Sequence, residues 1–199
     1  MFSQLSHFQK QDVFENPNAS ILHPIESTST LPQVNYYASP PAVRFINVND
    51  PAQFLIYTDG SCLDNVGPTS RAGCAIVYGE HGEHFTGCNG FAQSPSFEFR
   101  LGTRGQSGVL YPQTSNRAEL RAVIAALRYR EWTFEGFNSL VIATDSSYVV
   151  NGITSGISEW QENGWRTSAG HPVLNRDLWQ FLLSELKNWG EDGLSVEFW

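Results

Sequence analysis

The chain has 199 residues, enough for one domain with a sizeable core, and its 41% hydrophobic and 16% charged residues are typical of a globular protein. No apolar run approaches the ~20 residues that a membrane helix needs. The N-terminus also lacks the apolar stretch of a secretory signal and the arginines of a transit peptide. We therefore expect no membrane association and a nuclear or cytoplasmic location.

The formal net charge is −8, so the protein lacks the basic excess that usually marks binding to nucleic-acid phosphates. A metal site does not need that excess, because divalent cations can bridge an acidic protein to an anionic substrate. The cysteines are Cys62, Cys74 and Cys88. Their odd number and the absence of a CxxC pair favour reduced, mostly buried thiols over disulfides or structural zinc.

Residues 1–50 differ from the rest of the chain in that they contain prolines and serines without a sustained period. This composition predicts an irregular or disordered N-terminal arm, followed by one domain at 51–199. The apolar residues Phe45 and Ile46 leave open that the arm lies against the domain.

The first half of the domain predicts three strands. FLIYTD at 54–59 is a short apolar run that an Asp-Gly turn would end, and a second strand is expected at 72–79. For the third strand, we favour 97–102 over 85–92. A glycine-rich loop is expected at 102–114.

A helix is predicted at 117–132 from its strong helix formers, with a core-facing stripe at i, i+3, i+4 and i+7 and a cap at Thr114, Ser115 or Asn116. The continuous apolar run at 140–145 is typical of a strand buried on both faces, as in parallel pairing. Two short helices, a longer helix capped by Asn175 and a last strand follow, at 146–153, 157–165, 175–189 and 194–199. The order β-β-β-α-β-α-α-α-β predicts an α/β fold, with a mixed five-stranded sheet and helices on its faces.

Three carboxylates stand out by their placement. Asp59 and Asp145 end the first and fourth predicted strands, and Glu119 lies in the first turns of the first long helix. If those strands are neighbours, the three side chains meet at the carboxyl edge of the sheet, where such folds bind ligands. Crowded carboxylates repel one another unless a cation neutralises them, and oxygen ligands favour Mg²⁺ or Mn²⁺. Two such ions about 4 Å apart form a clamp for phosphoryl transfer, in which one activates water and the other stabilises the leaving oxygen.

Each acid also has an ordinary explanation, as a turn residue or as a surface charge at a helix N-terminus. The surrounding motifs favour the site. These are YTDGSCLDNVG (57–67), TSNRAELRAVIAAL (114–127), ATDSSYVVNGIT (143–154) and NGWRTSAGHPVLNRDLW (163–179). In their order and spacing they resemble the type-1 ribonuclease H family, from about Phe54 to Trp199, and RAGCAIVYG looks closest to fungal members.

The resemblance implies a ribonuclease H-like fold and an endoribonuclease that hydrolyses the RNA strand of DNA:RNA hybrids by a two-metal mechanism, leaving 5′-phosphate and 3′-hydroxyl ends. Carried over by motif, the catalytic and metal-binding residues are Asp59, Glu119 and Asp145, with Gly60 also in the metal site. The substrate-binding positions are Cys62, Asn65, Ser115, Asn116 and Ser146. Contacts to the 2′-hydroxyl are what distinguish RNA from DNA. Cys62 could instead be a small buried residue, and Asn65 a turn residue.

The chain also departs from the family pattern. Family members continue from the final strand into a loop with a histidine and a helix with a fourth metal-binding Asp, whereas this sequence ends at VEFW, so we expect a C-terminally truncated member without the last helix. The segment 156–164 carries no lysine or arginine, although Arg117, Arg121, Arg166 and Arg176 could touch phosphates or be ordinary surface residues.

Two alternatives to an active nuclease therefore remain open at this point. One is a catalytically weak or inactive remnant that binds nucleic acid or protein through the same fold. The other is a sugar-kinase-like or actin-like nucleotide binder, which is less favoured because such chains are usually much longer and need a second phosphate loop.

Overall fold

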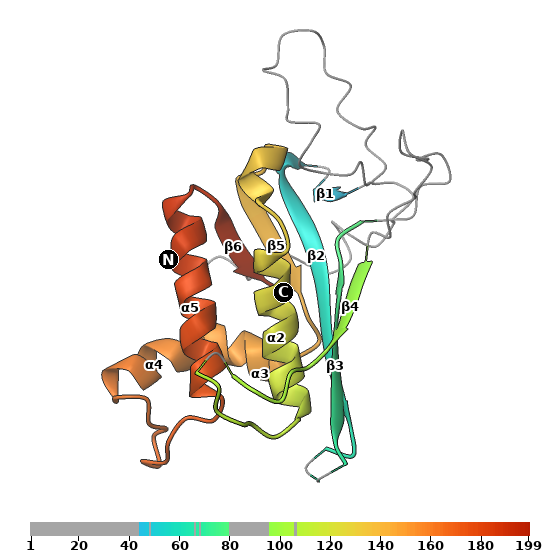
Figure 1. Cartoon of the computed structure of the whole chain (residues 1–199). Helices are drawn as coiled ribbons and strands as arrows, with labels where there is room; N and C mark the ends of the chain where they lie inside the picture. Colours follow the sequence, from blue (N-terminus) through green and yellow to red (C-terminus); the bar gives the residue numbers. More distant parts are fainter. Residues whose placement is uncertain (1–43, 48, 66, 68, 80–95, 106) are drawn as a thin grey trace, which may run out of the picture.

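The computed structural model describes residues 44–47, 49–65, 67, 69–79, 96–105 and 107–199. Its central feature is a mixed sheet with the strand order β4-β3-β2-β5-β6 (Figure 1). Strands β2 (Asp50–Leu63), β3 (Arg71–Val77) and β4 (Ser96–Arg100) pair antiparallel, and β5 (Ser139–Ala143) and β6 (Ser195–Phe198) continue the sheet in parallel. The predicted mixed α/β fold is confirmed, and β4 is the third strand that the sequence favoured. The alternative at 85–92 lies outside the described residues.

A sixth strand, β1 (Phe45–Asn47), corrects the prediction of five strands. It pairs antiparallel with the first part of β2, with Phe45 opposite Leu55, inside the segment predicted to be an irregular arm. The preceding Arg44 is anchored as well, because its guanidinium donates two hydrogen bonds of 2.8 Å to the Glu135 carboxylate. The domain boundary near residue 50 stays a prediction, since residues 1–43 lie outside the described part of the chain.

Strand β2 is also longer than predicted. The sequence indicated a turn at Asp59-Gly60, but the ladder with β3 continues from Asp59 opposite Ala75 to Leu63 opposite Arg71. Asp59 therefore lies inside a strand and not at its end. The prediction was wrong because an Asp-Gly pair does not always form a turn. Gly60 stays extended and pairs with Cys74 in the ladder.

The predicted helices are all present, with small shifts at their ends: α2 (Ser115–Arg128), α3 (Ser147–Asn151), α4 (Ile157–Glu162) and α5 (Arg176–Glu191). A 3-10 turn, η2 (Trp132–Glu135), precedes β5, and a π-helical turn, η3 (Gly152–Gly156), joins α3 to α4. Thr114 caps α2, since its hydroxyl accepts from the backbone N–H of Arg117 at 3.3 Å. Among the described residues, no helix combines the length and the apolar character needed to cross a membrane.

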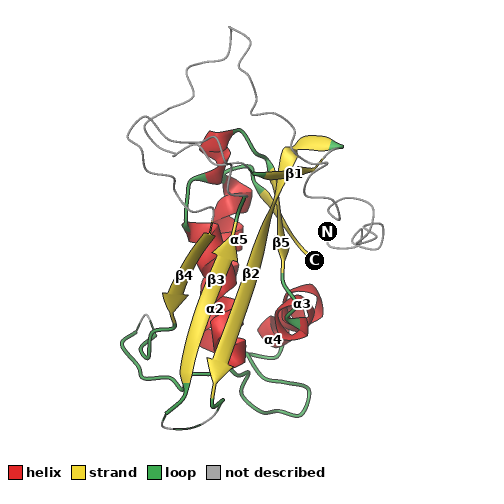
Figure 2. Ribbon diagram, turned by 90° about the vertical axis from the view of Figure 1, so that its right-hand side faces the viewer, coloured by secondary structure: helices red, strands yellow, loops and turns green. Residues whose placement is uncertain are grey.

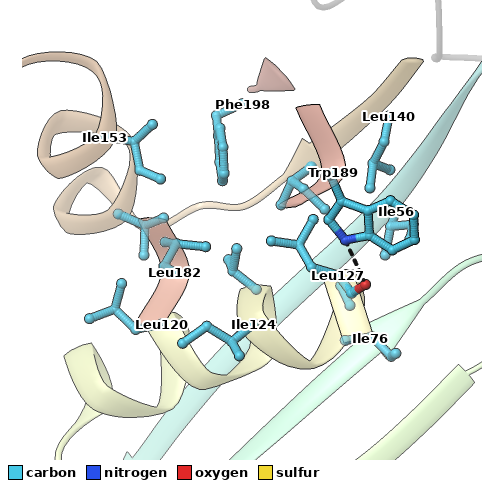
Figure 3. Packing of buried hydrophobic residues seen from close by; sticks show 14 of the residues in the cluster. Ile56, Ile76, Leu120, Ile124, Leu127, Leu140, Ile153, Leu182, Trp189 and Phe198 are labelled. Carbon is cyan, nitrogen blue, oxygen red and sulfur yellow. Dashed lines mark hydrogen bonds between the residues drawn. The ribbon is translucent and has the colours of Figure 1, made fainter. Parts of the chain in front are cut away.

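Helices α2 and α5 pack side by side on one face of the sheet and lie behind the strands in Figure 2. The main core fills the space between them and the strands, and Figure 3 shows Ile56 and Leu140 from the sheet facing Ile124 of α2 and Leu182 of α5. The opposite face carries a smaller cluster of Leu55, Val141 and Ala143, packed with Phe45 and Trp199. This core holds α2 in place against β2, which positions the candidate site.

One hydrogen bond inside this core gives a test of α5 docking. The indole nitrogen of Trp189 donates to the carbonyl oxygen of Leu127 at 3.0 Å (Figure 3). We expect Trp189→Phe to lower the free energy of unfolding by about 2 kcal/mol, because it removes a buried hydrogen bond and part of the ring volume. Urea denaturation measures the loss. The exposed-site control Lys187→Ala should stay within about 0.5 kcal/mol of the unsubstituted protein, and an equal loss in both variants would contradict the prediction.

Candidate functional site

The register between β2 and β5 places two acids at the same level. Parallel pairing runs from Gln53 opposite Ser139 to Tyr57 opposite Ala143. Asp59 and Asp145 each follow the last pair by two residues. Because both strands run in the same direction, the two aspartates lie next to each other at one end of the strand pair.

A close approach of α2 to β2 brings in the third acid. A Cβ atom added at Gly60 would lie 2.2 Å from the backbone nitrogen of Glu119 and 2.3 Å from the carbonyl carbon of Ala118. The first turns of α2 therefore lie directly on the strand, at a distance that only glycine permits. This contact places Glu119, which is 7% exposed, beside the two aspartates.

The three carboxylates form one cluster. Asp59, Glu119 and Asp145 each offer an oxygen atom that lies within 4.8 Å of the others. The two aspartates are exposed and Glu119 is buried. Such a group has the donor set that hard divalent cations prefer.

Burial, together with the charges of Asp59 and Asp145, raises the pKa of Glu119 from 4.5 to about 7. Hydrogen bonds from the backbone of Gly60 and the hydroxyl of Thr144 act in the opposite direction and orient the carboxylate. In the described part of the chain, Oε2 of Glu119 is buried without a hydrogen-bond partner. An unpaired buried carboxylate oxygen beside two other carboxylates fits a divalent cation, which would supply the missing interaction and compensate the repulsion.

Several of the predicted substrate residues lie around the start of α2. The side-chain oxygen of Asn65 accepts from the backbone N–H of Ser115 at 3.3 Å, which ties the loop after β2 to this helix. Asn116 is exposed in the next position. Cys62 is half-buried, with its sulfur 3.5 Å from the carbonyl oxygen of Gln113.

Ser146 and Thr144, the neighbours of Asp145 in the sequence, both use their hydroxyl groups in hydrogen bonds within the protein. The hydroxyl of Ser146, a predicted substrate residue, caps α3 by accepting from the backbone N–H of Val149 at 3.4 Å. Thr144 was not predicted as a site residue, although its hydroxyl bonds to Glu119. Its position between the end of the apolar run and Asp145 is the signal that could have found it.

Arg117 is the clearest correction among the candidate phosphate contacts. It is 3% exposed, and its guanidinium donates to both carboxylate oxygens of Asp177 at 2.9 and 2.8 Å and lies 4.0 Å from the ring centre of Tyr111. The sequence left open a phosphate contact or an ordinary surface position for Arg117. It could not show the buried pairing, because Asp177 is 60 positions away in the sequence. Arg166 and Arg176 are exposed, as expected of solvent-facing cations.

The described cysteines are free thiols. Cys74 is buried, and burial raises its pKa to about 12, which keeps the thiol protonated and unreactive. Cys88 lies outside the described residues.

Comparison with known proteins gives matches along most of the domain. The RNase H family model matches residues 51–190. A ribonuclease H of Treponema pallidum subsp. pallidum is 40% identical over 151 residues, which are 76% of this chain and 80% of that protein. A ribonuclease H of Aeromonas salmonicida is 39% identical over 131 residues, which are 66% of this chain and 68% of that protein.

Solved structures show a weaker likeness. A type 1 RNase H with the type 2 active-site motif has a TM-score of 0.46 at 24% identity, over 80% of this chain and 64% of that one. The RNase H domain of PFV has a TM-score of 0.45 at 20% identity, over 73% of this chain and 77% of that one. The family assignment therefore depends on the sequence matches, and the segment that the family model matches includes Asp59, Glu119 and Asp145. On these matches the chain belongs to the RNase H family.

Proposed function

We propose that this protein is an endoribonuclease that hydrolyses the RNA strand of DNA:RNA hybrids. The observation that carries the proposal is the meeting of Asp59 from β2, Glu119 from α2 and Asp145 from the loop after β5, with ligand oxygens within 4.8 Å of one another. A relative of 40% identity is named ribonuclease H, and the segment that the RNase H family model matches, 51–190, includes all three acids.

The cation proposed for this site is Mg²⁺, with Mn²⁺ as a substitute, in the two-metal arrangement that the family resemblance implies. Asp59, Glu119 and Asp145 would hold it, next to the backbone of Gly60. When bound, divalent cations neutralise the carboxylates and stabilise the negative charge that develops on the phosphate. The donor set supports this choice, because it consists of carboxylate oxygens without sulfur or imidazole.

The reaction adds water across one phosphodiester bond. A new bond forms between the water oxygen and phosphorus, the bond from phosphorus to the 3′-oxygen breaks, and a proton goes to that oxygen, so the products carry 5′-phosphate and 3′-hydroxyl ends. The protein contributes orientation: the Gly60 N–H and the Thr144 hydroxyl hold the Glu119 carboxylate, and the sheet register fixes Asp59 against Asp145. Positioning of this kind lowers the barrier without further covalent chemistry.

The hybrid would be bound next to the carboxylates by residues at the start of α2. Asn65 and Ser115 are already joined there by a hydrogen bond of 3.3 Å, and Asn116 is exposed beside them. We propose that these groups, with Cys62 and Ser146 nearby in the sequence motifs, contact the RNA backbone and its 2′-hydroxyls. With a formal net charge of −8, the protein should depend less on general attraction to phosphates than a basic nuclease does.

Cleavage of an end-labelled DNA:RNA hybrid in Mg²⁺ or Mn²⁺ tests the proposal. The protein should cut the RNA strand of the hybrid and leave duplex DNA intact, and Asp145→Asn should lower the rate about 100-fold or more because it removes one ligand charge without changing the size of the side chain. Asp192→Asn, an exposed acid after α5, is the control and should cut at the unsubstituted rate. The proposal would be contradicted if the unsubstituted protein did not cut the hybrid, or if Asp145→Asn cut it at the unsubstituted rate.

A further inference from the structure

Asn175, the residue before α5, is held in an uncommon backbone conformation and connects two other helices. Asn175 is the N-cap residue of α5, as the sequence predicted, but its φ of 57° lies in the left-handed region and its side chain makes no capping hydrogen bond. The side chain is used elsewhere: its Nδ2 donates to the hydroxyl of Tyr148 at 3.1 Å, and its Oδ1 accepts from Nη1 of Arg117 at 3.3 Å. A left-handed residue whose side chain is hydrogen-bonded at both ends of the amide indicates a structural demand at this position.

On one side the network reaches the helix that carries Glu119. Arg117 is two residues before Glu119 in α2, is 3% exposed, and is fixed by both oxygens of Asp177 and by the ring of Tyr111. A charged side chain held by so many contacts in a buried setting has little freedom to move. Its bond to Asn175 therefore links the start of α5 rigidly to the first turn of α2.

On the other side the network reaches the helix that follows Asp145. The hydroxyl of Tyr148 accepts from Asn175 and from the indole nitrogen of Trp179 at 3.0 Å, and donates to the carbonyl oxygen of Leu174 at 3.2 Å. These bonds use the donor and both lone pairs of the hydroxyl. Tyr148 lies in α3, three residues after Asp145, so the same asparagine also fixes the helix next to that acid.

We propose that Asn175 is a positioning residue for the metal site: through Tyr148 and Arg117 it fixes α3 relative to α2 and so sets the spacing between Asp145 and Glu119. The inference rests on the proposed function, because the spacing matters only if these acids share cations. Without the asparagine side chain, α2 still bonds to α5 through Arg117 and Asp177, and α3 still bonds to α5 through Tyr148 and Trp179. What is lost is a single side chain that bonds to both Arg117 and Tyr148 and so fixes the two helices directly against each other.

Asn175→Gly is the sharpest test, since glycine keeps the left-handed backbone and removes only the side chain. The full chain is titrated with MgCl₂ without substrate while its thermal unfolding midpoint is followed, and kcat and KM for a hybrid are then measured at fixed Mg²⁺. The half-saturating Mg²⁺ concentration is the one that gives half of the maximal shift in the unfolding midpoint, and we expect it to rise about 5-fold or more in the variant. We expect kcat to fall by a similar factor, and KM to change less than about twofold.

A second variant and a control keep the test decisive. Tyr148→Phe removes only the hydroxyl and should also raise the half-saturating Mg²⁺ concentration and lower kcat. The variant that combines Asn175→Gly and Tyr148→Phe should show no larger change than the stronger single variant, because both substitutions interrupt one network. Asn163→Gly, at the exposed end of α4, should leave the Mg²⁺ response unchanged. If Asn175→Gly does not fold, Tyr148→Phe is judged by the same criteria.

The outcomes separate the two proposals. An unsubstituted protein that neither responds to Mg²⁺ nor cuts the hybrid overturns the proposed function. An unsubstituted protein that does both, with a variant whose half-saturating Mg²⁺ concentration and kcat are unchanged, overturns the positioning role of Asn175. The positioning role is also overturned if the variant only has a lower thermal unfolding midpoint without metal, while its half-saturating Mg²⁺ concentration and kcat are unchanged. Such a result would show a purely structural contribution of Asn175.

Discussion

Gly60→Ala is expected to lower the free energy of unfolding by about 3–5 kcal/mol and to abolish hybrid cleavage in whatever fraction still folds. The added methyl would lie 2.2 Å from the backbone nitrogen of Glu119, and no flexible side chain is available to move away. The strand or the whole of α2 must shift to relieve the clash. Since Glu119 is carried by that helix, the shift also displaces a proposed metal ligand.

A glycine on the neighbouring strand provides a matched control. Gly73 in β3 lies opposite Ser61 in the ladder, and its added Cβ would contact only the carbonyl oxygen of Phe99 at 3.9 Å. We expect Gly73→Ala to be neutral or slightly stabilising, because alanine loses less backbone entropy on folding than glycine does. Chemical denaturation of both variants measures the difference. Equal stabilities for Gly60→Ala and Gly73→Ala would show that α2 is not held at the distance described.

Glu119→Gln is expected to abolish cleavage and, without metal, to stabilise the protein at alkaline pH. The loss of cleavage, about 100-fold or more, follows from the removal of a proposed ligand charge. The gain in stability follows from relief of the burial and repulsion that raise the pKa of Glu119 to about 7. A substitution that damages activity while it strengthens the fold is the signature of a binding site.

The direction with pH follows from proton linkage. Because the pKa of Glu119 is raised from 4.5 in the unfolded chain to about 7 in the folded protein, the folded state binds this proton more tightly. The stability of the metal-free protein should therefore fall as the pH rises from about 4.5 through 7, by on the order of 2–3 kcal/mol from this group. In Glu119→Gln this part of the pH dependence should disappear.

Denaturation in EDTA at pH 5 and pH 8 measures this effect. The unsubstituted protein and Glu119→Gln should differ little at pH 5 and clearly at pH 8, and Mg²⁺ should close the gap by stabilising only the unsubstituted protein. Glu162→Gln, an exposed acid in α4, should keep the unsubstituted pH profile. A constant difference between the two proteins at both pH values would exclude a raised pKa at Glu119 as its cause.

Local patterns in the sequence were sufficient for much of the fold. The continuous apolar run of β5 predicted a fully buried strand, and every residue of Ser139–Ala143 is buried. The i, i+3, i+4, i+7 stripe placed the core-facing side of α2 correctly, with Leu120, Ile124 and Leu127 fully buried. These features depend on residues close in sequence, where periodicity is informative.

Other features depend on partners that are distant in sequence. The Asp-Gly pair at Asp59 suggested a turn, because no local pattern shows that Gly60 provides room for a helix almost 60 residues later. Arg117 was expected to be a phosphate contact or a surface residue, since nothing near it in the sequence indicates the pairing with Asp177. The three acids of the site stood out by their placement in the predicted elements and by motif resemblance, whereas the contact of Thr144 with Glu119 and the left-handed Asn175 emerge only from tertiary structure.

The register of β2 and β5 also has a consequence for how this protein can vary. Asp59 and Asp145 are equally far from the last paired residues, so the separation of their backbones is set by the spacing of adjacent parallel strands. The connections between the elements, such as the long glycine-rich segment before α2, have no part in that separation. Their length can change without moving the two acids, whereas one residue inserted between Tyr57 and Asp59 would turn the aspartate to the other side of the sheet.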